Sequence, residues 1–111
     1  MAVVLKPIRD FLAEKQRLDR VPEEMFPLAE RPLPWTGYLA FNEKEQLIGM
    51  CGFKDVPDAD HRVEIAYYTL PEFEANGYAT AMARSLLEMA QEHPAASEVI
   101  AHPEGRERLG T

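Results

Sequence analysis

The 111-residue sequence predicts an α+β (α/β) protein, in which helices flank a mixed, mostly antiparallel sheet. Residues 37–70 read as three consecutive strands with polar turns between them, which is typical of an antiparallel meander. Residues 62–101 then read as strand, helix and strand, a crossover whose two strands should be parallel and whose connection should be right-handed. A chain of this length fits one domain spanning residues 1–111, with its core in 35–101.

The first 34 residues are expected to hold a helix and a proline-rich loop. Residues 8–20 should form the helix, because their apolar residues recur at roughly helical spacing between charged ones. These apolar residues are Ile8, Phe11, Leu12 and Leu18. Ahead of them, residues 2–5 are a poor candidate for a strand. Four prolines in 22–35 exclude a long regular helix there and leave at most a short turn at 23–28.

Three strands are expected in the middle of the chain. Residues 37–41 and 47–53 should form a hairpin around the polar turn 42–46. The third strand, 62–70, is rich in isoleucine, tyrosine and threonine, and Pro71 ends it.

One face of the segment that follows Gly77 carries a helical stripe. The stripe consists of Ala79, Met82, Ala83, Leu86, Met89 and Ala90. The helix is expected to run to about Glu92, since Pro94 stops it. Residues 97–101 should form a short final strand at the edge of the sheet, and an exposed edge invites pairing with a second chain. A homodimer is therefore expected.

Residues 72–84, between the third strand and this helix, are the most informative part of the sequence. Asn76 and Gly77 fall at the helix start, where backbone N–H groups have no intrahelical partner. Glycine lets an anion approach the backbone, and the helix dipole adds positive potential. The turn therefore indicates a site for a phosphate-bearing cofactor.

The composition narrows the class of partner and the compartment. A net charge of −7 argues against duplex nucleic acid or an anionic membrane as a partner. It weakly favours cationic substrates, although charge that serves only solubility is the more common case. No apolar run near the start is long enough for a signal peptide or a membrane span.

The cysteine and histidine residues give two further expectations. Cys51 is the only cysteine, so no internal disulfide can form and a reducing cytoplasm fits best. Its side chain should be a small buried apolar group. The three histidines lie apart from one another, so no metal site is predicted.

Three stretches of the sequence, in this order, form a series: WTGYLAF at 35–41, QLIGMCGFK at 46–54 and VEIAYYTLPEFEANGYAT at 63–80. The series resembles the GCN5-related N-acetyltransferase (GNAT) superfamily, nearest the branch that includes ribosomal-protein-alanine acetyltransferases. The resemblance covers about residues 35–101. That family's Gln/Arg-x-x-Gly-x-Gly/Ala turn is matched by residues 74–79.

This resemblance implies an N-acetyltransferase that uses acetyl-CoA as cosubstrate and needs no metal. Its acceptor would be a primary amine of a small molecule or of a protein amino terminus. The resemblance places the pyrophosphate of the cofactor on the turn, mainly on the N–H groups of residues 76–80. The matching residues are Glu74, Ala75, Asn76, Gly77, Tyr78, Ala79 and Thr80. The pantetheine arm would pair, like an added strand, with backbone groups near Tyr68, Thr69 and Leu70.

The sequence departs from the family pattern at three places. Glu74 stands where the family often has Gln or Arg, and a carboxylate ~6 Å from a phosphate costs at most roughly 3 kcal/mol. The amino terminus lacks a clear first strand. The tail at 102–111 is short, so part of the acceptor pocket and any general acid from that region are expected to be missing.

The chemistry needs a base, because a lysine-like amine has a pKa near 10.4 and only ~1 in 1000 is free base at neutral pH, a cost of roughly 4–5 kcal/mol. Glu64 is the candidate, and the resemblance places it where many relatives have a carboxylate facing the cleft. Partial burial or a relay water would help it act. The alternative is a strand carboxylate on a solvated face, paired with Lys54 or Arg62. His102 is a weaker candidate base.

Two roles stay open for each of several other side chains. Arg84 could reach a phosphate of CoA or be solvated, and Tyr67 could pack in the core or line the cleft. Trp35 and Phe41 belong either to the core or to the rim of the acceptor groove.

Two alternatives to an intact acetyltransferase also stay open. The chain could be a catalytically degenerate acyl-CoA-binding or protein-interaction module of the same fold, or the sequence could lack a segment of the intact protein.

Overall fold

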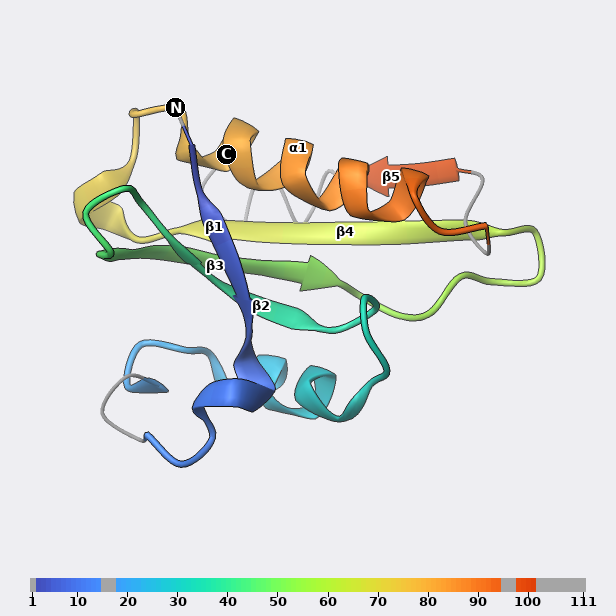
Figure 1. The fold of residues 1–111 in the computed structure, drawn as a ribbon, viewed down its shortest axis with the longest axis horizontal. Coiled ribbons are helices and arrows are strands. Elements are labelled where there is room, and N and C mark those ends of the chain that lie inside the picture. The colour runs from blue at the N-terminus through green and yellow to red at the C-terminus, as the bar shows by residue number, and fades with distance from the viewer. Residues whose placement is uncertain (1, 15–17, 95–97, 102–111) are drawn as a thin grey trace.

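The computed structural model describes residues 2–14, 18–94 and 98–101. In chain order its elements, with η for a 3₁₀ helix, are β1 (Val4–Pro7), η1 (Ile8–Phe11), η3 (Glu23–Glu30), β2 (Gly37–Phe41), β3 (Leu47–Phe53), β4 (Arg62–Thr69), η4 (Pro71–Phe73), α1 (Tyr78–Gln91) and β5 (Glu98–Ala101). The strands form one sheet in the order β1-β2-β3-β4-β5 (Figure 1). β1 to β4 pair antiparallel, and β4 and β5 pair parallel. The expected mixed, mostly antiparallel sheet with a strand–helix–strand crossover is confirmed.

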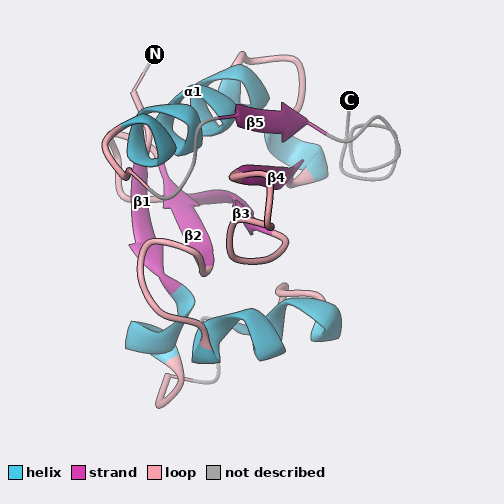
Figure 2. Ribbon diagram, turned by 90° about the vertical axis from the view of Figure 1, so that its right-hand side faces the viewer, coloured by secondary structure: helices cyan, strands magenta, loops and turns pink. Residues whose placement is uncertain are grey.

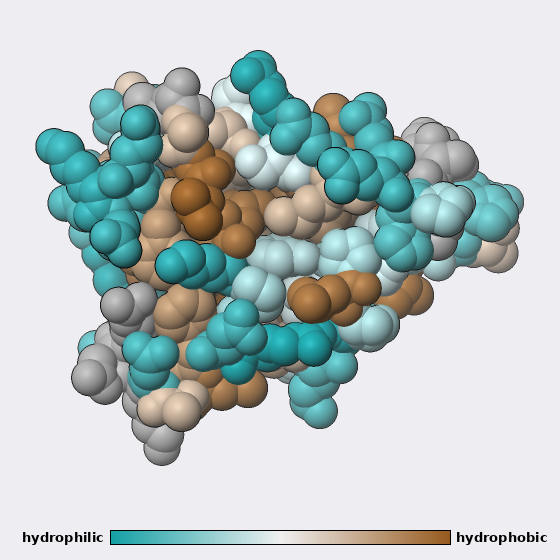
Figure 3. All heavy atoms as spheres, in the orientation of Figure 1, coloured by the Kyte–Doolittle hydropathy of each residue, from teal (hydrophilic) through white to brown (hydrophobic). Residues whose placement is uncertain are grey.

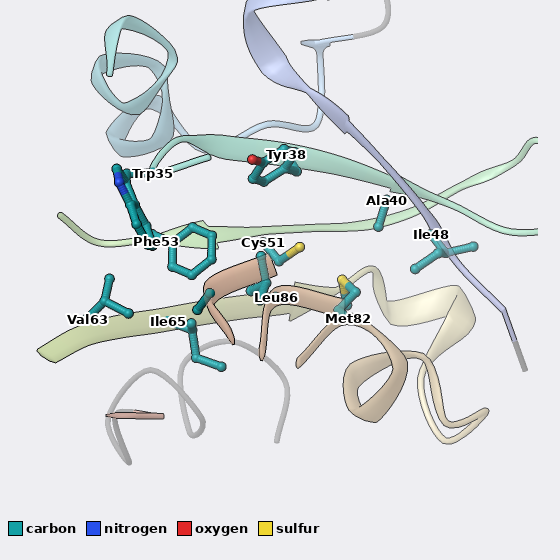
Figure 4. Close-up of a cluster of buried hydrophobic side chains, with 11 residues drawn as sticks. Trp35, Tyr38, Ala40, Ile48, Cys51, Phe53, Val63, Ile65, Met82 and Leu86 are labelled. Atoms are coloured by element: carbon teal, nitrogen blue, oxygen red, sulfur yellow. The ribbon is translucent and has the colours of Figure 1, made fainter. Parts of the chain in front are cut away.

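Helices cover both faces of the sheet (Figure 2). α1 packs on one face, where Met82, Leu86 and Ala90 are buried along the predicted stripe. In Figure 4, Met82 lies at the Ile48 end of this cluster, and Val63 lies at the opposite end with Trp35 and Phe53. Since Val63 is near the start of β4, α1 runs back along β4 and its first turns lie over the carboxyl end of that strand.

The other face of the sheet is covered by η1 and η3. Residues of both segments pack with side chains of β2 and β3 in a second buried cluster. Its most buried members are Ile8, Leu39, Met50 and Leu70. The sheet is therefore buried on both sides, which explains why neither face of β4 reads as purely polar.

The amino-terminal part differs from the prediction in two ways. The expected helix over 8–20 is wrong: η1 ends at Phe11, residues 12–14 form a turn and Leu18 is in a 3₁₀ conformation, while residues 15–17 lie outside the described residues. Ile8 and Phe11 are buried at a spacing of three, which suits a 3₁₀ helix, whereas Leu12 is 48% exposed. A first strand, β1, does exist and pairs with β2 from Val4↔Phe41 to Pro7↔Tyr38.

A β-bulge interrupts the pairing of β2 and β3. Ala40 faces Gly49 and Phe41 faces Leu47, so Ile48 is the extra residue. The bulge shifts the alternation of side chains along β3: Leu47 packs on the η-helix side, and Ile48 on the α1 side. The C=O of Ile48 accepts the N–H of Leu70 at 2.9 Å, which fixes the carboxyl end of β4 beside the bulge.

Cys51 lies on β3 inside the α1-side cluster and is 1% exposed. Burial raises the pKa of its thiol. The prediction of a small buried apolar side chain is confirmed.

The surface shows no large apolar area among the described residues. Large exposed apolar side chains are scattered over separate elements, and on the face in Figure 3 brown patches alternate with hydrophilic groups. Within the described part of the chain, no helix combines the length and apolarity that crossing a membrane requires.

Candidate active site

The turn between η4 and α1 is held open by its own backbone and side chains. Ala75 and Gly77 have φ values of 65° and 81°, so two of three successive residues adopt the left-handed conformation. The Asn76 amide donates to the carbonyl oxygens of Phe73 at 3.1 Å and of Glu74 at 3.0 Å. The side chain therefore folds back under the turn and fixes its shape.

The N–H groups of residues 75–80 have no protein acceptor among the described residues. The first bond of α1 runs from the Ala81 N–H to the Gly77 carbonyl at 3.1 Å, and no side chain caps the helix. A side chain at Gly77 would meet nothing within 4 Å, so the space beside this residue is open. Donors at a helix start, with open space beside them, can hold an anion.

Replacing Gly77 tests the backbone of this turn. Gly77→Ala should lower the free energy of unfolding by about 1 kcal/mol, because φ is positive and no steric clash adds to that cost. Gly77→Asn is the matched control and should lose less, since asparagine tolerates the left-handed region. Urea denaturation measures both. Equal stability of the alanine variant and the wild type would contradict the left-handed conformation.

Beyond the last described pair, Ile65↔Ala101, no described residue pairs with the edge of β4 that faces β5, and this part of the strand is called its open edge. On the side of β3, the backbone N–H of Lys54 donates to the Glu64 carbonyl at 2.8 Å. Every second residue of β4, counted from Glu64, therefore bonds to β3 through its backbone. By this alternation Tyr68 directs its backbone groups to β3. The N–H and C=O groups of Tyr67 and Thr69 point to the open edge instead.

Of the three residues expected to pair with an extended ligand, Thr69 presents its backbone at this edge, whereas Tyr68 and Leu70 are turned toward β3. Tyr67 was not among them. Tyr67 can be found from the alternation of backbone groups along β4. Once one residue of β4 is known to bond to β3, its two neighbours must direct their backbone N–H and C=O groups to the opposite edge.

Glu64 lies near the start of β4, on the η-helix side together with Tyr68. Its side chain is 33% exposed, and Oε2 lies 3.6 Å from Lys54 Nζ. The structure thus contains the ion pair with Lys54 that the alternative reading expected. Five residues of strand separate Glu64 from Thr69, about 17 Å at the usual rise.

An ion pair that the sequence did not reveal joins the amino-terminal segment to the turn. Arg20 donates to both carboxylate oxygens of Glu72, the longer contact measuring 3.0 Å. Each charge favours the other, so the pKa of Glu72 is lowered and that of Arg20 is raised. Both side chains are about half exposed, and such pairs add little stability. The pair does connect the chain before η3 to η4, immediately ahead of the turn.

The structure also gives the burial and position of most of the other residues singled out from the sequence. Trp35 and Phe41 are core residues, Tyr67 packs against the α1-side cluster, and Arg84 is exposed on α1. Glu74 is exposed, so solvent screens its charge. His102 lies outside the described residues. Among the described residues, no group of three or more histidine, cysteine, aspartate or glutamate side chains is placed to hold a metal ion.

Comparisons with known proteins agree with this geometry. A sequence model of the acetyltransferase (GNAT) domain matches residues 8–106. A spermidine N-acetyltransferase chimera from Vibrio cholerae and hSSAT has a similar structure, with 14% identity, a TM-score of 0.68 and coverage of 98% of this chain and 76% of that one. A GNAT-family acetyltransferase from Bacillus anthracis is also similar, with 16% identity, a TM-score of 0.61 and coverage of 99% and 80%.

At this identity the solved structures show a shared fold, and they assign no branch of the family. A search of curated protein sequences finds no match. The model match alone spans nearly all of the sequence. The chain therefore belongs to the GNAT acetyltransferase family.

Proposed function

We propose that this protein transfers an acetyl group from acetyl-CoA to a primary amine of a small molecule or of a protein amino terminus. The observation that carries the proposal is the turn at 75–80, whose N–H groups have no protein acceptor among the described residues. Family membership supports it, because GNAT acetyltransferases use acetyl-CoA.

The backbone does most of the binding in this proposal. The amides of residues 76–80 hold the diphosphate, and the positive end of α1 adds to their attraction. Tyr67 and Thr69 then pair with the amides of the pantetheine arm along the open edge of β4, as an added strand would. The exposed Glu74 carboxylate reduces this affinity only slightly, because water screens it.

Glu64 is proposed as the base at the far end of the strand. The amine nitrogen attacks the thioester carbonyl, so a C–N bond forms, the C–S bond breaks and CoA leaves as a thiolate, which takes a proton from water to become the thiol. The proton of the amine passes to Glu64, directly or through one water. The distance of about 17 Å along β4 is comparable to an extended phosphopantetheine arm, so one ligand could reach from the turn to this carboxylate.

The acceptor is proposed to be cationic at neutral pH. A net charge of −7 favours a positively charged amine over an anionic one. Spermidine belongs in the test panel because one similar structure is a spermidine N-acetyltransferase chimera. A peptide with a free amino-terminal alanine represents the protein acceptors, as expected for the ribosomal-protein-alanine branch.

A binding module without turnover is the second candidate. The ion pair of Glu64 with Lys54 favours it, because the lysine occupies the carboxylate that would have to accept the proton of the amine. Both candidates share the cofactor turn and differ only in turnover.

Melting curves with acetyl-CoA, with CoA and without ligand test the proposal. At 100 times its dissociation constant a ligand should stabilise the protein by about 2.7 kcal/mol, which raises the melting temperature by roughly 10 °C. Absence of a shift with either ligand would refute the cofactor assignment. A shift without release of free thiol across the amine panel would favour the binding module.

The homodimer and the cytoplasmic location complete the proposal. β5 lies at one edge of the sheet, which supports a second chain pairing there or completing the site.

A further inference from the structure

Thr69 holds a buried hydroxyl with no hydrogen-bond partner in the described part of the chain. The residue is 2% exposed, and its Oγ1 atom is buried without a donor or acceptor. Buried polar groups are nearly always paired, because an unpaired one costs free energy. An orphan hydroxyl at the end of a central strand therefore needs an explanation.

The position of this hydroxyl relates it to the cofactor turn. Thr69 is the last residue of β4 and lies opposite Gly49 on β3, so both residues point to the same face of the sheet. A Cβ at Gly49 would lie 3.2 Å from Met82 Cε and 3.2 Å from Thr69 Cα. The Thr69 side chain thus lies under the first turns of α1, where the N–H groups of residues 78–80 also have no acceptor among the described residues.

We infer that the Thr69 hydroxyl is a cosubstrate-binding group, which hydrogen-bonds the phosphopantetheine part of CoA where β4 ends beneath the start of α1. The inference rests on the proposed function and adds to it a side chain in a site otherwise built from backbone. Three unused groups meet at this junction: the hydroxyl, the backbone of Thr69 at the open edge, and the amides of the turn.

Contact with a ligand requires a small rearrangement, since Oγ1 is covered in the free protein. Because the whole residue is only 2% exposed, rotation about χ1 alone would not bring the hydroxyl to a ligand. The side chains that cover Thr69 must therefore move aside when a ligand pairs along its backbone. The cost of the orphan hydroxyl in the free protein would then be relieved in the complex.

Thr69→Val distinguishes the role of the hydroxyl in the free protein from its role in the complex, because valine keeps the shape of threonine and removes the hydroxyl. In the free protein this change should raise the melting temperature by a few degrees, since an unsatisfied buried group is lost. The same variant should bind CoA and 4′-phosphopantetheine about tenfold more weakly. Its affinity for adenosine 3′,5′-bisphosphate, which lacks the arm, should be unchanged. Thr69→Ser retains the hydroxyl and should keep most of the CoA affinity.

Thr36→Val is the matched control. Thr36 is also fully buried, but its hydroxyl donates to the Leu28 carbonyl at 2.6 Å. This variant should melt at a lower temperature than the wild type and bind CoA with wild-type affinity. Calorimetry of each variant with the three ligands provides the readout.

Three results would overturn the inference. Wild-type CoA affinity in Thr69→Val would remove the hydroxyl from the site and leave the proposed function standing, because the wild type still binds. A melting temperature lowered as far as that of Thr36→Val would mean that the hydroxyl has a partner within the protein. Failure of the wild type itself to bind CoA would refute the proposed function, and the inference with it.

Discussion

Glu64→Gln is expected to lower the rate of acetyl transfer at neutral pH by about 10²–10⁴-fold while acetyl-CoA affinity stays nearly constant. Glutamine keeps the size and polarity of the side chain but cannot accept the proton of the amine. Steady-state rates and calorimetric affinities measure the two effects separately. The loss should shrink as the pH approaches the pKa of the acceptor amine, because free base is then supplied by the solvent.

Lys54→Gln is the control that separates catalysis from structure. It breaks the same ion pair as Glu64→Gln, in which Oε2 and Nζ are 3.6 Å apart at a partly exposed site. If Glu64 served only that pair, both variants would lose the same activity. We expect Lys54→Gln to retain activity or to gain some, since the lysine then no longer competes with the amine for the carboxylate of Glu64. Equal rates for Glu64→Gln and the wild type would remove Glu64 from the mechanism.

Gly49→Ala is expected to lower the free energy of unfolding by about 3 kcal/mol, the largest stability effect predicted for this protein. The new Cβ would lie 2.2 Å from the backbone carbonyl oxygen of Tyr68 and 3.2 Å from Thr69 Cα. Backbone cannot move aside as a flexible side chain can, so β3 and β4 must separate locally. Urea denaturation gives the loss, and calorimetry should show weaker CoA binding because the end of β4 is displaced.

Gly37→Ala on β2 provides the comparison for this prediction. Its closest contact would be 3.1 Å to Ile8 Cδ1, the end of a flexible side chain. A clearly smaller loss of stability is expected, since Ile8 can adjust. Equal losses in the two variants would show that glycine entropy, rather than the close approach of backbone, sets the cost at Gly49.

The elements with a strong local pattern could be predicted from the sequence. The hairpin at 37–53 has two apolar runs around a polar turn, and α1 has a long stripe of period 3.6. Each of these patterns is set by neighbours in the chain. The crossover rule then gave the parallel pairing of β4 and β5 without any knowledge of tertiary contacts.

The amino-terminal elements could not be predicted, because distant contacts decide them. β1 has four residues and exists through its pairing with β2, more than thirty positions away. In 8–20, the spacing of three between Ile8 and Phe11 fits an α-helix and a 3₁₀ turn equally well. Packing of Ile8 and Phe11 on β2 and β3 selects the shorter form and leaves Leu12 outside.

The candidate site also contains features that a local sequence pattern predicts and features that depend on distant contacts. The Asn76-Gly77 turn was visible in the sequence because an Asn-Gly pair, which tolerates a left-handed backbone, stands directly before a helical stripe. The open edge of Tyr67, the orphan hydroxyl of Thr69 and the pair between Arg20 and Glu72 depend on register and on contacts across the fold. No local pattern encodes them.

The burial of Cys51 gives this protein a native reporter of its own breathing motions. A maleimide or disulfide reagent can reach the only thiol of the sequence when β3 parts from the helix that covers it. Under conditions where reclosing outpaces modification, the labelling rate measures the free energy of that opening. Occupancy by a ligand that binds the closed form should slow the labelling in proportion, so covalent modification of one atom could monitor the whole sheet.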